Sequence, residues 1–597
     1  MACSTSKQVC ARLARLRKEF AARQFSAWIA PTGDPHLSEY LPEHWALRKY
    51  LSGFTGSAGT LVVTETKAAL WTDSRYWEQA TRQLAGTGIE LMRDGESATP
   101  KIGEWLSVSV PKNSVVGADL RTLSSRVAYE IEQILARRNI SLSHDGSVID
   151  KVWKERPAAS LNPVRVFEYG GATRRQKLSR VRGRMRREGA SGLLISTLDD
   201  IAWMTNLRGD DIACTPVFLA FLLITRKQAL LFIDSRKIGK EIVRSLAQDG
   251  IECRPYEQIW TEALPLVPEN GALWLDERRT CALFVSLAQS AEYSIIDSIQ
   301  PTMEMKAHKD RRELRLIEQA MEYDGAALCE FYSWLEGALR RGGALSEWRL
   351  SEKLHEFRAR SSHFFEESFT TIVAVDANAA EPHYTPDKSR SAPLKGASVL
   401  LIDSGAQYDC GTTDITRTSA IGNVPEQARR DYTAVLRGHI ALAATPFPDG
   451  VFSGQLDTIA RMPVWQIGED YGHGTGHGVG FHLSVHEGPA SISPRAPAEN
   501  SSRVHPGLLV SNEPGLYRAG LWGIRIENLV TPVKAGSMLR FKTLTLCPID
   551  TRMICRDMLS AAEIRWLNDY HKEVRKRLLP LVSEQAAEWL RQATRPL

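Results

Sequence analysis

The stretch SVLLIDSGAQYDCGTTDITRTS (398–419) carries two aspartates in strand-like surroundings. Residues 398–402 form a short apolar run typical of a buried strand, and Asp403 stands at its end. Asp414 follows eleven residues later, within the strand-like segment 412–419. A hairpin would place the two carboxylates side by side, where they repel each other unless a proton or a cation lies between them. The alternative is that each aspartate only ends a strand at a turn.

Four histidines lie in the motif YGHGTGHGVGFHLSVH (471–486), and glycines flank both His473 and His477. Glycine lets the backbone approach a ligand closely, and neutral imidazole is a common ligand of divalent metals. A phosphate-binding loop is the alternative, but the motif lacks the lysine and the strand-to-helix arrangement of a P-loop. The motif therefore favours a metal site.

Two glutamates follow in similar surroundings: Glu513 in NEPG (512–515), after a strand-like segment, and Glu527 in the alternating segment GIRIEN (523–528). Either glutamate alone would more often be a surface carboxylate. Taken with both aspartates and a histidine, they form an oxygen-rich set that suits manganese or cobalt, with zinc and iron(II) as alternatives. Four carboxylates also balance two divalent ions, which can activate a bridging water.

Composition limits the other function classes. The 597 residues exceed one hydrophobic core, and 43% hydrophobic and 24% charged residues are ordinary for a folded protein. A net charge of +5 is too dilute to indicate nucleic-acid binding, and the basic segment RGRMRR (182–187) is interpreted as a solvated helix face. The longest apolar run, TPVFLAFLLIT (215–225), is too short to cross a membrane and is expected to form a buried strand.

Cysteine usage and the N-terminal segment bear on the compartment. Nine cysteines without a CxxC pair predict reduced thiols and a cytoplasmic protein. The first residues are basic and contain no acid before Glu19, so a mitochondrial presequence is an alternative. Leu13, Leu16 and Phe20 lead directly into a strand-like segment, however, and we expect the first helix of a folded domain.

Three regions follow one another along the chain. Residues 1–160 and 161–305 each alternate helical segments with short strands, which predicts two similar α/β domains in tandem. Residues 306–597 begin with a long helical pattern and contain all the candidate ligands. The predicted fold class is thus α/β and α+β, with the candidate chemistry in the third domain.

The motifs resemble those of the Xaa-Pro aminopeptidases, the aminopeptidase P family. The resemblance at the site rests on DSGAQYDCGTTDITRT (403–418), GHGTGHGVGFHLSVHEGP (472–489), NEPG and GIRIEN. The chain also resembles the long three-domain eukaryotic-type branch of the family, in the segments PTGDPHLSEY (31–40), LSGFTGSAGT (51–60), WTDSRYW (71–77), NLRGDD (206–211) and FKTLTLCPID (541–550). The family implies two creatinase-like N-terminal domains, a C-terminal pita-bread metallopeptidase domain and a homodimer.

The resemblance also implies a ligand role for each member of the metal set. Asp403 resembles the terminal ligand of one metal, and Asp414 and Glu527 resemble the carboxylates that bridge both ions. His477 and Glu513 resemble the ligands of the second metal. Two divalent ions per chain are implied, with manganese the family's usual metal and cobalt or zinc as alternatives.

For catalysis, the resemblance implies that a hydroxide bridging the metals attacks the bond before proline while Glu513 shuttles its proton. His383 and His486 resemble the two histidines that hold the substrate, and His473 and Arg525 match residues that line the site. The expected substrates are peptides with proline at the second position. Neither a nucleic acid nor a membrane is expected as a partner.

Alternatives remain on the same fold. A prolidase would cut only dipeptides and usually lacks the tandem N-terminal domains, and a methionine aminopeptidase rarely carries two such domains. A metal-free binding module belongs to a different functional class, and the full ligand set argues against it. The segment DANAAEP (376–382) replaces the family's glycine-containing approach to the first substrate histidine, so we expect the pocket wall to differ there.

Overall fold

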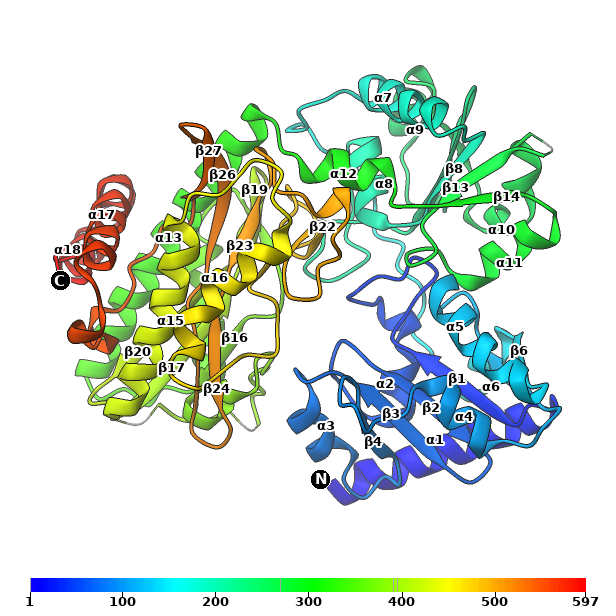
Figure 1. Cartoon of the computed structure of the whole chain (residues 1–597), viewed down its shortest axis with the longest axis horizontal. Helices are drawn as coiled ribbons and strands as arrows, with labels where there is room; N and C mark the ends of the chain where they lie inside the picture. Colours follow the sequence, from blue (N-terminus) through cyan, green and yellow to red (C-terminus); the bar gives the residue numbers. More distant parts are fainter. Residues whose placement is uncertain (1, 269, 390, 395) are drawn as a thin grey trace. The chain divides into compact units, whose positions relative to one another are not determined.

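The computed structural model (Figure 1) describes residues 2–268, 270–389, 391–394 and 396–597. The chain divides into two compact units. Unit 1 comprises Met1–Glu168, Ala172–Ala213 and Val217–Thr302, and unit 2 comprises Tyr169–Gly171, Cys214–Pro216 and Met303–Leu597.

Unit 1 contains two six-stranded sheets with the same topology. The first sheet has the order β4 (Glu90–Arg93), β3 (Ala68–Thr72), β2 (Thr60–Thr64), β1 (Ala27–Pro31), β5 (Val115–Ala118), β6 (Ser141–His144). The second has the order β12 (Glu252–Arg254), β11 (Ala229–Ile233), β10 (Ala220–Thr225), β8 (Gly192–Ile195), β13 (Ala272–Leu275), β14 (Ser294–Asp297). In both sheets the third strand pairs antiparallel with its two neighbours and the other pairs are parallel. The repeated topology agrees with the predicted pair of similar α/β units.

Helices connect and cover these strands. The helices of unit 1 are α1 (Ala2–Ala21), α2 (Leu47–Ser52), α3 (Trp77–Leu84), α4 (Ile102–Ser109), α5 (Ser125–Leu135), α6 (Ser147–Val152), α7 (Arg174–Arg187), α8 (Leu198–Thr205), α9 (Lys240–Gln248), α10 (Ile259–Glu262) and α11 (Ala282–Ser290). Leu13, Leu16 and Phe20 of α1 are buried in the core beside Trp28 and Leu61 of the first sheet. Their spacing forms one helix face, which is why the N-terminal segment packs as a helix of this domain.

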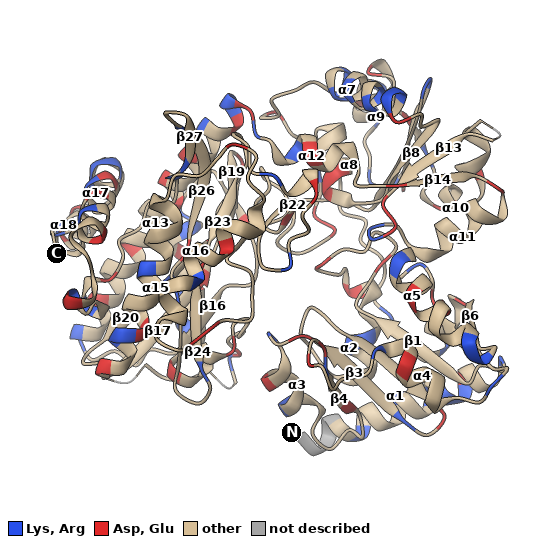
Figure 2. Cartoon of the chain, viewed as in Figure 1, with Lys and Arg blue, Asp and Glu red and all other residues tan. Residues whose placement is uncertain are grey.

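Two other predictions concern the basic segment 182–187 and the apolar run 215–225. Lys and Arg residues are concentrated on α7 (Figure 2), where Leu178, Val181 and Met185 are buried and Arg186 and Arg187 are exposed. A solvated basic face on an amphipathic helix is therefore observed. Only the second half of the apolar run at 215–225 forms a strand, the buried β10 (Ala220–Thr225), because residues 215–219 precede it without regular structure. No helix within the described residues is both long and apolar enough to cross a bilayer.

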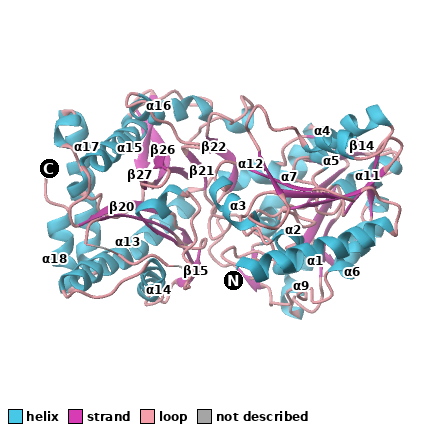
Figure 3. Cartoon of the chain, turned by 90° about the horizontal axis from the view of Figure 1, so that it is seen from below, coloured by secondary structure: helices cyan, strands magenta, loops and turns pink. Residues whose placement is uncertain are grey.

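Unit 2 combines small sheets with long helices (Figure 3). Its strands are β15 (Phe364–Glu367), β16 (Ile372–Val375), β17 (Ser398–Ser404), β18 (Ala406–Tyr408), β19 (Gly411–Thr412), β20 (Ile415–Ile421), β21 (Gly476–Gly478), β22 (Glu487–Ile492), β23 (Val510–Asn512), β24 (Gly515–Arg518), β25 (Trp522–Arg525), β26 (Asn528–Ala535) and β27 (Met538–Thr543). The helices are α12 (Pro301–Ala307), which begins in unit 1, α13 (Arg311–Arg340), α14 (Glu347–Arg358), α15 (Glu426–Ala444), α16 (Ser453–Trp465), α17 (Ala561–Leu578) and α18 (Glu584–Ala593).

Two of these sheets position the candidate site. Strand β17 lies between β16 and β20, and the second sheet has the order β22-β21-β23-β26-β27. Every residue of β17 is buried, and Leu400 and Ile402 pack with Leu350 and Leu354 of α14. In Figure 3, β20 lies between α13 on one side and α15 on the other. Helices on both sides explain why the central strand is a continuous apolar run.

Candidate metal centre

Strand pairing brings Asp403 and Asp414 to the same end of a sheet. Strands β17 and β20 pair antiparallel with Asp403 opposite Thr416, and Asp414 lies directly before β20. The side-by-side placement of the two aspartates is as the sequence indicates. Residues 412–419 are not one continuous strand, however, because residues 406–412 form the separate hairpin β18–β19 in another sheet. Both aspartates are buried, with 8% and 4% exposure.

His477 lies on β21 with one ring nitrogen facing these acids. Its Nδ1 donates to the carbonyl of Gly478 over 2.9 Å. Its Nε2 lies 3.5 Å from Oδ2 of Asp414 and 3.4 Å from Oε1 of Glu513. A histidine that donates its other ring N–H to a backbone carbonyl presents a fixed lone pair, which is the usual arrangement of a metal ligand.

Close packing of β21 against its neighbours requires glycine on both sides of His477. A Cβ at Gly476 would lie 2.0 Å from the carbonyl oxygen of Ser511, and one at Gly478 would lie 2.2 Å from that of Glu487. Both distances are far below van der Waals contact. A larger residue at either position would therefore push β21 away from its neighbours and move the histidine.

Glu527 completes a three-residue cluster. It stands between β25 and β26, is 2% exposed, and its Oε2 accepts a 2.8 Å hydrogen bond from Oγ1 of Thr416. Its backbone N–H donates to the carbonyl of Thr416 over 3.1 Å. Ligand atoms of Asp414, His477 and Glu527 all lie within 4.8 Å of one another. Residues from three separate strand regions thus converge on one point.

The electrostatics of the cluster favour a cation. Burial, followed by repulsion from neighbouring carboxylates, raises the pKa of Asp414 and of Glu527 well above the usual range. Burial is also the largest cause that raises the pKa of Glu513 to about 7, while Arg525 opposes the increase. Oδ1 of Asp403 is buried without a hydrogen-bond partner among the described residues. Divalent cations would offset the repulsion between the carboxylates and would provide a partner for this oxygen of Asp403.

Arg525 connects several of these groups. Its side chain is 3% exposed and donates to Oδ2 of Asp403 over 2.6 Å and to Oγ1 of Thr416 over 3.1 Å. It also donates to the hydroxyl of Tyr517 over 2.6 Å, and that hydroxyl lies 2.7 Å from Nε2 of His473. Arg525 and His473, which the sequence analysis assigned to the lining of the site, are therefore held together through one tyrosine.

Of the two predicted substrate histidines, His486 lies beside this cluster, and His383 follows a residue that contacts Arg525. The ring of His486 packs edge-on against that of His477, with centroids 4.3 Å apart. Pro382, directly before His383, accepts a 3.3 Å hydrogen bond from Arg525 through its carbonyl. The other eight predicted site residues are connected to the cluster directly or through neighbouring side chains, whereas the position of the His383 side chain stays a prediction.

The unusual segment 376–382 forms a wall next to β25. Its first part is the 3-10 helix η5 (Asp376–Ala380), and a Cβ at Gly523 of β25 would lie 1.7 Å from the carbonyl oxygen of Ala379. Buried Glu347 accepts hydrogen bonds from the side chain of Asn378, within the segment, and from that of Tyr384, two residues beyond it. The segment is thus anchored despite its departure from the family pattern.

Sequence reasoning missed Thr416, Ser511 and Tyr517. The hydroxyl of Ser511 donates to Oε1 of Glu513 over 3.3 Å. Strand alternation could have identified this residue, because it lies two positions before Glu513. Thr416 lies two residues after Asp414 and could have been found in the same way. Tyr517 carries no such signal, since its contacts depend on how the β24–β25 hairpin folds.

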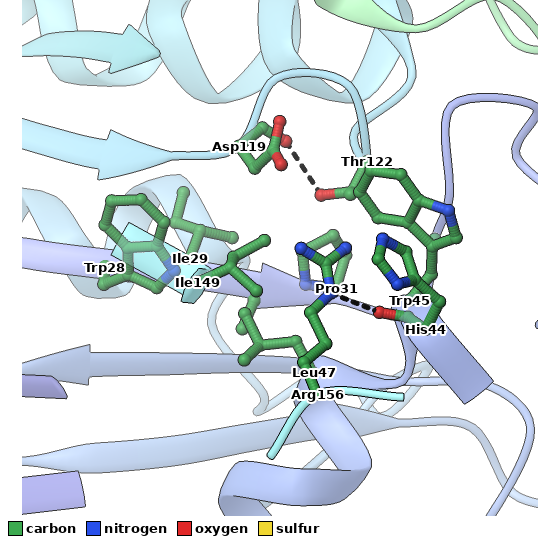
Figure 4. A pocket seen from close by; sticks show the side chains of 12 residues that line it. Trp28, Ile29, Pro31, His44, Trp45, Leu47, Asp119, Thr122, Ile149 and Arg156 are labelled. Atoms are coloured by element: carbon green, nitrogen blue, oxygen red, sulfur yellow. Dashed lines mark hydrogen bonds between the residues drawn. The ribbon is translucent and has the colours of Figure 1, made fainter. Parts of the chain in front are cut away.

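Unit 1 contains a small pocket that differs in size from a peptide-binding site (Figure 4). Trp28, Trp45 and Arg156 are among its lining residues, and its cavity measures about 10 Å³. That volume accommodates about one water molecule. The pocket is too small for a peptide.

Four family models cover nearly the whole chain. The model of the creatinase/prolidase N-terminal domain matches residues 12–152, and a second model of that domain matches residues 155–313. Metallopeptidase family M24 matches residues 315–532, and the C-terminal region of peptidase M24 matches residues 537–597. These matches confirm the predicted fold class of two creatinase-like domains followed by a metallopeptidase domain.

Individual relatives extend over the full length. A Xaa-Pro aminopeptidase of Drosophila melanogaster is 38% identical, with 96% of each chain covered. Aminopeptidase P2 of Arabidopsis thaliana is 39% identical over 96% of this chain and 86% of its own. The structure of an X-prolyl aminopeptidase from Caenorhabditis elegans, described as a cytosolic enzyme with a di-nuclear active site, has a TM-score of 0.93 at 32% identity, covering 99% of this chain and 100% of its own.

Proposed function

The chain belongs to the Xaa-Pro aminopeptidases of metallopeptidase family M24, and on this premise we propose that it hydrolyses the first peptide bond of peptides whose second residue is proline. The predicted enzyme class is thereby confirmed. We extend the di-nuclear site and the cytosolic location described for the Caenorhabditis elegans relative to this chain. The observation that carries the proposal is the convergence of Asp414, His477 and Glu527 on one point.

Five side chains would hold the two metals. We assign Asp403 as a terminal ligand, Asp414 and Glu527 as bridging ligands, and His477 with Glu513 as ligands of the second ion. The buried, unsatisfied Oδ1 of Asp403 and the mutual repulsion of the carboxylates support this assignment. Four carboxylates and one imidazole form a donor set suited to manganese, with cobalt or zinc as alternatives. Bound there, two divalent ions would supply a bridging hydroxide and polarise the scissile carbonyl.

The protein groups then have separate tasks. Glu513 would accept a proton and pass it to the leaving nitrogen, since its Oε1 lies at the cluster, 3.4 Å from Nε2 of His477. His486, packed against His477, and His383 would hold the substrate carbonyl and its developing negative charge. Arg525 orients the carboxylate of Asp403 through a 2.6 Å ion pair. The carboxylate of Asp403 would also attract the free amino terminus and so restrict cleavage to the first residue.

Two further predictions remain proposals. The division into residues 1–160, 161–305 and 306–597 is supported by family models that begin and end near these positions. The homodimer follows only from membership in the family. Light scattering of the purified chain would show twice the monomer mass for a dimer and the monomer mass otherwise.

A direct comparison of substrates tests the activity. An Arg-Pro-Pro tripeptide, an Xaa-Pro dipeptide and a tripeptide without proline are each incubated with the protein, with and without manganese. We expect release of the first residue from the proline tripeptide when metal is present. Cleavage of the dipeptide alone would identify a prolidase, and no cleavage with any divalent metal would identify a binding module.

A further inference from the structure

Arg417 is a buried arginine directly behind the metal cluster. It lies on β20, three residues after Asp414, and is 2% exposed. Its Nη1 donates to the backbone carbonyls of Thr416 and Glu527 over 2.9 and 2.7 Å. One guanidinium nitrogen therefore ties together the two strand regions that carry Asp414 and Glu527.

The other guanidinium nitrogens of Arg417 bind the C-terminal region. Nε donates to the carbonyl of Pro548 over 3.0 Å, and Nη2 donates to the carbonyl of Cys547 over 2.8 Å and to the hydroxyl of Tyr570 over 2.9 Å. These acceptors are all neutral oxygens. Because five N–H groups in a fixed plane need matching acceptors, the C-terminal region supplies the geometry that holds this arginine.

Tyr570 of α17 completes the attachment. It is 8% exposed, and its hydroxyl lies 3.0 Å from the carbonyl of Thr545 and 2.9 Å from that of Cys547, and receives a hydrogen bond from the backbone N–H of Cys547 over 3.3 Å. Its ring stacks on Trp566 with centroids 5.5 Å apart. The hydroxyl thus joins α17 to the segment that follows β27.

A second path leads from Arg417 to Glu513. Nη2 of Arg417 also donates to Oδ1 of Asn528 over 2.8 Å, and Nδ2 of Asn528 lies 3.0 Å from Nε2 of His439. The opposite ring nitrogen of His439 donates to the carbonyl of Asn512 over 3.1 Å. Burial, and then the charge of Arg417, lowers the pKa of His439 to about 3, so the ring stays neutral and can accept and donate at once. Asn512 directly precedes Glu513.

We propose that the C-terminal region is a positioning element of the metal centre and acts through Arg417 and Tyr570. By fixing the strand regions around Asp414, Glu527 and Glu513, it sets the spacing of carboxylates that the metals require. The inference rests on the proposed function and concerns residues that touch neither metal nor substrate. Partners behind a ligand shell typically change metal affinity or activity about 10–100-fold when removed.

The test compares two tyrosine variants of the full chain. Tyr570→Phe removes one hydroxyl and keeps the ring stacked on Trp566. Tyr293→Phe is the matched control, because its hydroxyl donates to the carbonyls of Leu264 and Val267 in unit 1, whereas the proposed metal ligands belong to unit 2. The readouts are the melting temperature without metal, the number and dissociation constants of bound manganese ions, and kcat and KM for the tripeptide.

We expect both variants to fold, with similar small losses of melting temperature. Tyr570→Phe alone should bind manganese about tenfold more weakly, and its kcat should recover when manganese is raised while KM stays unchanged. His439→Gln, a change on α15, provides a second variant that interrupts the path to Asn512 and should weaken manganese binding in the same way.

Two outcomes separate the inference from the proposed function. Wild-type affinity for manganese in a folded Tyr570→Phe or His439→Gln variant would show that the network is only structural, and would leave the proposed function intact. A wild-type chain that binds no divalent ion would overturn the proposed function and the inference with it.

Discussion

Removal of the metals should make the stability of unit 2 strongly dependent on pH. In the metal-free molecule the pKa of Glu513 is raised from its ordinary value of 4.5 to about 7, mainly by burial. A carboxyl group whose pKa is higher in the folded state stabilises that state only while it is protonated. This contribution is complete below pH about 4.5 and is lost as the pH rises through about 7.

The magnitude follows from the pKa difference. Each pKa unit corresponds to about 1.4 kcal/mol, so full ionisation of Glu513 costs the metal-free fold about 3 kcal/mol. About 2 kcal/mol of this loss falls between pH 5.5 and pH 8.5. Since about 1 kcal/mol shifts the melting temperature of a large domain by roughly 2–4 °C, the effect is measurable. Bound metals that balance the charge of the carboxylates should remove this dependence of stability on pH.

Thermal unfolding of chelator-treated protein provides the assay, with Glu513→Gln as the control that cannot ionise. Metal-free wild type should lose about 2 kcal/mol more than the variant between pH 5.5 and pH 8.5. Manganese-loaded wild type should not show this loss. If metal-free wild type and Glu513→Gln had parallel profiles, burial would not raise the pKa of Glu513, and ionisation of this carboxyl would not destabilise the metal-free fold.

Three substitutions extend the test. Asp414→Asn should abolish both metal binding and hydrolysis, and a variant that retained either would contradict its bridging role. Arg525→Met should lower the free energy of unfolding in urea by about 3–5 kcal/mol, because it leaves Asp403 buried without its partner; an unchanged value would show that the pair contributes nothing. Gly523→Ala should raise KM, since its Cβ would displace the carbonyl of Ala379 and the pocket wall attached to it; wild-type KM would show that this wall does not touch the substrate.

The sequence predicted the parts of the site that depend on local pattern. The apolar run of β17 identified a buried strand, and the positions of Asp403 and Asp414 followed from its pairing with β20. The predicted extent of the second strand was wrong, because the chain changes sheet between the two aspartates. At this change the backbone N–H of Ala406 donates to Oγ1 of Thr413. Residue alternation cannot reveal a change of sheet.

Long-range contacts are the part that the sequence could not supply. Arg525 was expected to line the site, but its shortest contact with an acid joins it to Asp403, 122 residues away. Arg417 reaches Tyr570 across 153 residues, and nothing in its own motif indicates a partner in the C-terminal region. Such pairs depend on tertiary packing, whereas motif spacing reports only on neighbours along the chain.

Manganese-loaded crystals, with anomalous scattering measured at the metal's absorption edge, test the metal centre most directly. Two peaks per chain are expected, both in contact with the carboxylates of Asp414 and Glu527 and only one in contact with His477. A single peak, or metal bound away from these side chains, would contradict the two-metal centre and with it the proposed mechanism of hydrolysis.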